Sequence, residues 1–316
     1  MIAPPTIAAT APDAFSTATA PDHVASTPDL PDLFPPVQPR RGFWGFARRH
    51  PAIAVGGALV LAMLLIALFA PWLGTVDPTA LAPARRTREP SAVFWFGTDM
   101  LGRDIYSRVL YGTRVSLTVG FSVAILASLA GLSIGLVSGF IRRADGIVMR
   151  VMDGLMSIPP ILLAVALMAL TRGSVGNVIT AITIAEIPRV SRLVRSVVLS
   201  LREQPYVDAA VAAGTRTPMI ILRHILPNTL APMTVQATYV CASAMIVEAI
   251  LSFIGAGTPP TIPSWGNIMA EGRALWQVKP YIVFFPAAFL SITVLAVNLL
   301  GDGLRDALDP RLAKRL

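Results

Sequence analysis

Two glutamates interrupt the apolar runs of this chain and are the first residues whose chemistry needs an explanation. Glu186 and Glu248 each stand within a long stretch of apolar residues. If these stretches cross a bilayer, a central charge costs roughly 2.5 to 3.5 kcal/mol on insertion scales, so such residues mark solute pathways or internal contacts. We expect Glu248 in the outer half of its stretch, where it lines a translocation path or bonds a neighbouring helix. Glu186 precedes Pro188, and we expect it at a solvated helix end.

The remaining reactive side chains match no catalytic or metal-binding signature. Neither lysine can complete a phosphate-binding Walker loop, because Lys279 precedes Pro280 and Lys314 precedes Arg315. A single cysteine, Cys241, excludes an intrachain disulfide and a thiolate cluster. The 3 histidines are scattered and form no metalloprotease motif: His23, His50 and His224. We therefore predict no enzymatic activity, no cofactor and no metal, and we expect any ATP hydrolysis in a separate chain.

The composition is typical of a chain that is embedded in a lipid bilayer. Of its 316 residues, 54% are hydrophobic and 14% are charged, whereas a soluble domain is about a quarter charged. A bilayer core of about 30 Å requires roughly 20 apolar residues per helix. We predict an all-α polytopic membrane protein with six transmembrane helices, at residues 52–73, 115–140, 149–171, 174–196, 231–256 and 281–300.

Positive charge predicts the orientation of these spans. The net charge of +8 could indicate a nucleic-acid partner in a soluble protein, but topology explains it here. Most of the 26 Lys and Arg residues fall in segments that would be cytoplasmic if both termini are cytoplasmic, although the first external loop is rich in arginine. We predict both termini in the cytoplasm and no nucleic-acid partner.

The chain divides into four segments. Residues 1–40 are rich in Pro, Ala and Thr and are predicted to form a disordered cytoplasmic tail. Residues 41–111 hold an interfacial elbow, the first span and the first external loop. Residues 112–303 form a core with five spans and a polar loop at about 197–230, and residues 304–316 are a cytoplasmic C-terminal tail.

The polar loop at 197–230 contains residues that typically start and end helices, in an order that predicts two short helices. Pro205 suits an early helical position, and Gly214 fits the left-handed position just beyond a helix end. Thr217 is expected to cap a second helix that has Pro218 at its first position and ends at Pro227. Its apolar face is too short to cross lipid, so we expect the groove of a partner protein to cover it.

This loop resembles the EAA loop of ABC importer permeases, the cytoplasmic element that docks into a cleft on the ATP-hydrolysing subunit. The residues that carry the resemblance are Asp208, Ala209, Ala210, Gly214, Leu226 and Pro227. Asp208 stands where the family usually has glutamate, and His224 where isoleucine is common. The resemblance implies that these residues couple the permease to ATP hydrolysis.

Three further stretches narrow the resemblance to C-type permeases of the dipeptide, oligopeptide and nickel importers. They are residues 96–117, residues 248–266 and residues 301–311. Residues 96–114 and 258–279 are the only long outer segments, so we expect a substrate-binding protein to dock there. Its candidate contacts are Asp99, Arg103, Asp104, Arg108 and Trp265.

The resemblance implies the type I permease fold of ABC importers, in the bacterial cytoplasmic (inner) membrane. Its expected partners are a homologous B-type permease, two ATP-hydrolysing subunits, an extracytoplasmic substrate-binding protein and the lipid bilayer. The expected substrate is a di- or oligopeptide, and the alternatives are nickel chelates or other small peptide-like solutes. A stand-alone secondary transporter is the remaining alternative, but we find no convincing internal repeat of the kind that such proteins carry.

Overall fold

The structure, a computed structural model, describes residues 43–308. The described residues form helices and turns without a β-strand, apart from one isolated bridge between Thr98 and Asp104. The all-α prediction is therefore confirmed for this part of the chain. The predicted tail at 1–40 and the end of the predicted tail at 304–316, from residue 309 onward, lie outside the described residues.

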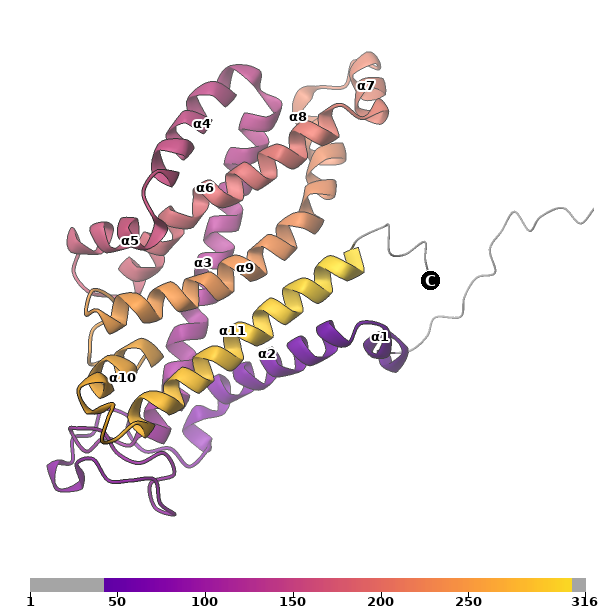
Figure 1. Cartoon of the computed structure of the whole chain (residues 1–316). Coiled ribbons are helices and arrows are strands. Elements are labelled where there is room, and N and C mark those ends of the chain that lie inside the picture. The colour runs from indigo at the N-terminus through magenta and orange to yellow at the C-terminus, as the bar shows by residue number, and fades with distance from the viewer. Residues whose placement is uncertain (1–42, 309–316) are drawn as a thin grey trace, which may run out of the picture. The chain divides into compact units, whose positions relative to one another are not determined.

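Four long helices pack in sequence across the bundle (Figure 1): α2 on α11, α11 on α9, and α9 on α3. α6 packs along α3 and also contacts α9. The helices are α1 (Phe43–Arg49), α2 (Pro51–Phe69), α3 (Ile105–Phe140), α4 (Arg142–Met156), α5 (Pro160–Ala169), α6 (Val175–Arg202), α7 (Pro205–Ala212), α8 (Thr217–Ile220), α9 (Leu226–Phe253), α10 (Trp265–Gly272) and α11 (Tyr281–Leu308).

The two ends of this bundle differ in kind. One end carries a cap, made of residues 73–104 and 258–280, which includes α10 (Figure 1). The opposite end carries a helical hairpin of residues 205–225, made of α7, α8 and the π turn Ile221–Ile225. The spans thus separate two structures that can contact different partners.

Fewer helices qualify as candidate spans than the six that the sequence predicts. Four helices of the described residues are long and apolar enough to cross a membrane: Pro51–Trp72, Ile105–Phe140, Thr217–Phe253 and Tyr281–Leu308. α4 and α5 make a fifth candidate if they count as one span, bent by 85°. The predicted fourth span lies in α6, where Glu186, Arg189 and Arg192 interrupt the apolar run. Six spans are therefore not confirmed.

The bend between α4 and α5 follows from two prolines. Pro160 occupies the first turn of α5, and Pro159 precedes it in an extended conformation. A proline disfavours the helical conformation of the residue before it, so the chain cannot continue α4 through this pair. The predicted third span, 149–171, is consequently two helices rather than one.

The contact between α3 and α6 depends on small residues at four-residue spacing. Gly131, Gly135 and Gly139 of α3 lie against valines of α6. A β-carbon at Gly135 would lie 2.6 Å from Cβ of Val194, closer than any real contact. The glycine stripe lets two backbones approach, as expected for helix packing in a membrane.

α11 continues beyond its predicted end at residue 300, through two glycines, to Leu308. The glycines serve helix contacts rather than a helix end: a β-carbon at Gly301 would lie 2.1 Å from Oγ1 of Thr238 on α9. α3 likewise starts earlier than predicted, at Ile105, because the Asp104 side chain caps its first turn by accepting a hydrogen bond from the Ser107 amide at 2.8 Å.

Candidate functional site

The turn between α7 and α8 has the geometry that its sequence predicts. Gly214 has φ of +75°, the left-handed conformation that glycine adopts without steric cost. Its amide donates to the Val211 carbonyl at 3.0 Å, and the Thr215 amide donates to the Ala210 carbonyl at 3.1 Å. These two bonds form a Schellman motif, which ends α7 and turns the chain toward α8.

The second helix of the hairpin differs from the prediction at both ends. Its N-cap is Arg216 rather than Thr217, and the Arg216 carbonyl accepts hydrogen bonds from the amides of Met219 and Ile220 at 2.9 and 3.1 Å. Pro227 does not end the helix, because α8 continues through the π turn into α9. In that turn the Leu226 amide donates to the Ile221 carbonyl, five residues back. The wider turn accommodates Pro227, which lacks an N–H.

Buried side chains join the hairpin to the bundle. Val207 of α7, Ile220 of α8 and Ile225 of the π turn are almost completely buried. All three belong to the same apolar core as the long helices. Because the hairpin also continues directly into α9, a displacement of the hairpin must move α9 with it.

The exposed surface of the hairpin combines one carboxylate with apolar side chains. Asp208 and Ala209 are exposed on α7, and Ala210 is partly buried. Val211 and Leu222 remain 57% and 60% exposed, and Met219 is also exposed. An apolar patch beside an acid suits a groove with a basic rim on another protein. Leu226 and Pro227 lie at the junction with α9, away from the turn at Gly214.

Glu248 lies in a hydrogen-bonded junction between α9 and the cap. The Ser252 hydroxyl donates to Oε1 of Glu248 at 2.8 Å, and it also lies 3.1 Å from the Thr258 hydroxyl. The Thr258 hydroxyl in turn donates to Ser264, the residue before α10, at 3.3 Å. The Glu248 side chain is fully buried. The carboxyl is thus enclosed and bonded within α9, and Ser252 is the residue that joins this helix to the cap.

Glu186 is a buried residue of α6, so the expectation of a solvated helix end is wrong. Its side chain is only 1% exposed. The Ser243 hydroxyl of α9 donates to Oε1 of Glu186 at 3.2 Å, and Arg189 places Nη1 3.4 Å from Oε2. The error arose because α6 extends to Arg202, well beyond the predicted end of the span, which leaves Glu186 near the middle of the helix.

Four charged side chains form a largely buried network between the cap and the start of α3. Asp99 Oδ2 accepts from Arg103 Nε at 2.7 Å and from Arg108 Nη1 at 2.6 Å. Glu271 of α10 also pairs with both arginines, and its Oε2 lies 2.5 Å from Arg108 Nη1. The network therefore joins the 97–104 segment, the first turns of α3 and α10.

The residues predicted to contact a binding protein are mostly interior. Asp99, Arg103 and Arg108 are buried in this network, and Asp104 caps α3. Trp265 is fully buried, and its Nε1 donates to the Val109 carbonyl at 3.1 Å. In this structure these side chains hold the cap together, and most of them are not exposed to a partner. Sequence reasoning missed Glu271, because its partner Arg108 is 163 residues away and no local pattern joins them.

One exposed ion pair ties the two parts of the cap together. Lys279 Nζ donates to Glu89 Oε1 at 2.6 Å. This hydrogen bond holds the pKa of the Glu89 carboxyl below its ordinary value. Since both groups lie at the surface, the pair contributes little to stability but connects the 73–104 loop to the segment before α11.

Two protein families match this chain. Residues 127–314 match the family described as binding-protein-dependent transport system inner membrane component. Residues 38–90 match the N-terminal TM domain of oligopeptide transport permease C. Between them, the two matches include α2, the α7–α8 hairpin, α9 and α11.

Several curated proteins are similar over most of their length. The "Probable peptide ABC transporter permease protein y4tQ" of Sinorhizobium fredii is 54% identical over 269 residues, which cover 85% of this chain and 92% of that protein. The dipeptide transport system permease protein DppC of Alkalihalophilus pseudofirmus is 40% identical, and the match covers 91% of this chain and 95% of that protein. The glutathione transport system permease protein GsiD of Pectobacterium atrosepticum is 40% identical, covering 87% and 92%.

A solved structure shares the fold at low sequence identity. It is an inward-facing conformation of the MetNI methionine ABC transporter, with a TM-score of 0.54 and 20% identity. The match covers 64% of this chain and 96% of that one. At this identity the similarity extends to the fold alone.

Proposed function

Because this chain belongs to the family of binding-protein-dependent transport system inner membrane components, we propose that it is the permease subunit through which an ATP-driven importer carries short peptides. Family membership makes it a multi-pass inner-membrane protein and part of a transport system. The single observation that carries the mechanism is the α7–α8 hairpin, which is exposed at its tip and packed into the hydrophobic core of the helix bundle at its base.

The proposed substrate rests on the relatives. The names of the three curated relatives above refer to a peptide, a dipeptide and glutathione, all of which contain amide-linked amino acids. This range supports a short peptide as the substrate. Another peptide-like solute is the alternative.

The proposed partners follow from the two ends of the bundle. A homologous B-type permease would complete the path, and two ATP-hydrolysing subunits would bind the hairpin in the cytoplasm. A substrate-binding protein would bind the outer surface of the cap. Exposed cap residues such as Arg86, Trp95 and Trp276 replace the buried residues above as its candidate contacts. This orientation puts both termini in the cytoplasm and fits the positive charge near the hairpin.

The proposed mechanism is alternating access driven by the ATP-hydrolysing subunits. When they close on nucleotide, they move the hairpin through Asp208 and the apolar residues beside it. The continuous helix from Thr217 to Phe253 would transmit this movement across the membrane. At its far end, Glu248 and Ser252 connect α9 to the cap. A shift of α9 would therefore alter the cap, where the binding protein docks.

The test is reconstitution of the whole transporter in vesicles with its binding protein. We expect uptake of a radiolabelled dipeptide that requires ATP inside and the binding protein outside, and ATPase activity that rises when the binding protein is loaded. A transporter without the binding protein is the control. Uptake driven by a proton or sodium gradient in the absence of ATP would contradict the proposal and favour a secondary transporter.

A further inference from the structure

A continuous apolar groove follows α2 and α3 from the cap end into the middle of the bundle. Its outer part has a volume of about 650 Å³ and is lined by α2 and α3, including Leu68 and Arg114. Its inner part has a volume of about 360 Å³ and is lined by α2, α3, α9 and α11. Phe121 and Ile125 line both parts, so the two parts adjoin, and we treat them as one groove.

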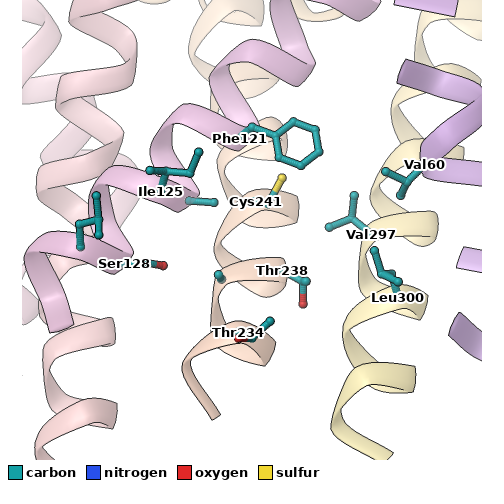
Figure 2. Close-up of a pocket in the computed structure, with 12 residues that line it drawn as sticks. Val60, Phe121, Ile125, Ser128, Thr234, Thr238, Cys241, Val297 and Leu300 are labelled. Carbon is teal, nitrogen blue, oxygen red and sulfur yellow. The ribbon is translucent and has the colours of Figure 1, made fainter. Parts of the chain in front are cut away.

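The inner part is almost entirely apolar. Figure 2 shows side chains of four helices converging on one space, with Val60 from α2, Phe121 from α3, Cys241 from α9 and Val297 from α11. Small residues, including Ala237, make up part of its wall. Apart from the unpaired Ser128 hydroxyl, the lining offers little to a polar solute, whereas a hydrocarbon chain would gain packing contacts along most of it.

The outer part ends at an arginine with spare donors. Arg114 donates from Nε to the Ala67 carbonyl and from Nη2 to the Leu68 carbonyl at 3.0 Å, and its guanidinium lies over the Tyr111 ring at 5.2 Å. The two carbonyls belong to the last turn of α2, so Arg114 lies where that span ends. A guanidinium has more N–H donors than two carbonyl oxygens can use, and phosphate is an acceptor that it binds well.

The length of the groove matches one leaflet. From Arg114 to Ser128, α3 rises about 21 Å at about 1.5 Å per residue. Half of a bilayer, including the headgroups, measures about 20 to 22 Å. A phosphate at Arg114 and a chain end beside Ser128 therefore fit a single lipid.

We infer that this groove is a phospholipid site: the phosphate binds Arg114 in the leaflet on the cap side, and one acyl chain lies between α2 and α3 and ends in the pocket beside Cys241. A helix of another subunit is a poor fit, since an α-helix is about 10 to 12 Å across with its side chains. Such a helix could cover the mouth of the groove but could not enter the inner pocket. The bound lipid fills the gap between four spans and thereby bridges α2 to α3, α9 and α11.

The test uses the complete transporter in nanodiscs that contain a phospholipid with a photoreactive diazirine near the end of one acyl chain. We expect cross-links on the α9 segment that contains Thr234, Thr238 and Cys241. Arg114→Gln should lower lipid retention in native mass spectrometry by about tenfold, the loss of roughly one charge-assisted hydrogen bond. Arg86→Gln, a change at an exposed arginine of the cap, is the matched control and should retain the lipid.

A second variant separates lipid loss from misfolding. Ala237→Phe fills the inner pocket and leaves Arg114 intact, so it should abolish the α9 cross-links while the subunits still copurify. Cross-links on another subunit in place of α9 would show that a protein helix covers the groove and would overturn the inference. Undiminished α9 cross-links in both Arg114→Gln and Ala237→Phe would also overturn it.

Discussion

Gly214 determines the path of the chain between α7 and α8. Its φ of +75° lies in the region where a β-carbon costs roughly 1 to 2 kcal/mol. A β-carbon there would meet no other atom within 4 Å, so the backbone conformation alone imposes the requirement for glycine. The consequence of a substitution is therefore a changed turn rather than a clash.

We expect Gly214→Val to misdirect α8 and to uncouple ATP hydrolysis from uptake, while the chain still inserts in the membrane. The measurement is peptide uptake per ATP hydrolysed in reconstituted vesicles. Ala213→Val is the matched control, because Ala213 has φ of −74° and tolerates a side chain. Equal coupling in the two variants would show that the turn conformation is not needed.

Asp208 is the charged residue on the exposed face of α7. We expect Asp208→Lys to reduce copurification of the ATP-hydrolysing subunit severalfold, because it reverses a charge in the proposed contact. Asp208→Glu keeps the charge and should retain the subunit. If the lysine variant copurifies as well as the unmodified chain, the acid does not contribute to docking.

Among the elements, the cap depends on its buried ion pairs. Arg108 is 1% exposed and pairs with both Asp99 and Glu271. Removing one partner of a buried pair leaves an uncompensated charge, which costs about 3 to 5 kcal/mol. The cap and the start of α3 should therefore loosen together when this arginine is lost.

We expect Arg108→Ala to lower the free energy of unfolding by about 3 to 5 kcal/mol, seen as a lower midpoint of thermal unfolding in detergent. Lys279→Ala removes the exposed pair with Glu89 in the same cap and should change the midpoint little. If the midpoint shifts by a similar amount in both variants, burial does not strengthen the ion pairs of Arg108.

The contact between α3 and α6 can also be tested with a matched pair of variants. We expect Gly135→Val to separate these helices and to lower the yield of folded protein, because its β-carbon would overlap Val194. Gly154→Val is the control: Gly154 lies in α4, where a β-carbon would meet no atom within 4 Å. Size-exclusion chromatography of the detergent-solubilised chain provides the readout, and two equally monodisperse variants would contradict the packing role.

For the whole molecule, the proposed orientation is the property that most needs a measurement. The start of α2 and the end of α11 lie together, since a β-carbon at Gly303 would lie 2.7 Å from the Ile53 amide nitrogen. The first turn of α2 and the last turns of α11 therefore lie at the same end of the bundle. We expect a reporter fused after Leu316 to be active only in the cytoplasm, and we expect the same of one fused before Met1. Activity outside the cytoplasm would mean that the hairpin lies outside and the cap lies in the cytoplasm.

Local chemistry was sufficient to predict much of this protein. The apolar runs predicted α2, α3, α9 and α11, because a helix that crosses lipid must be apolar along its length. The left-handed turn at Gly214 was also predictable, since residue type at a helix end controls the backbone conformation there. These features depend on residues that are close in sequence.

Other features depend on residues that are far apart in sequence, and only tertiary packing decided them. Pro227 lies within a continuous helix because a π turn accommodates it, and Glu186 is buried because α9 places Ser243 beside it. Arg108 is buried where it pairs with Glu271, a residue far along the chain. Whether a polar side chain is exposed or paired depends on which segment packs over it, and that contact forms only when the helices assemble.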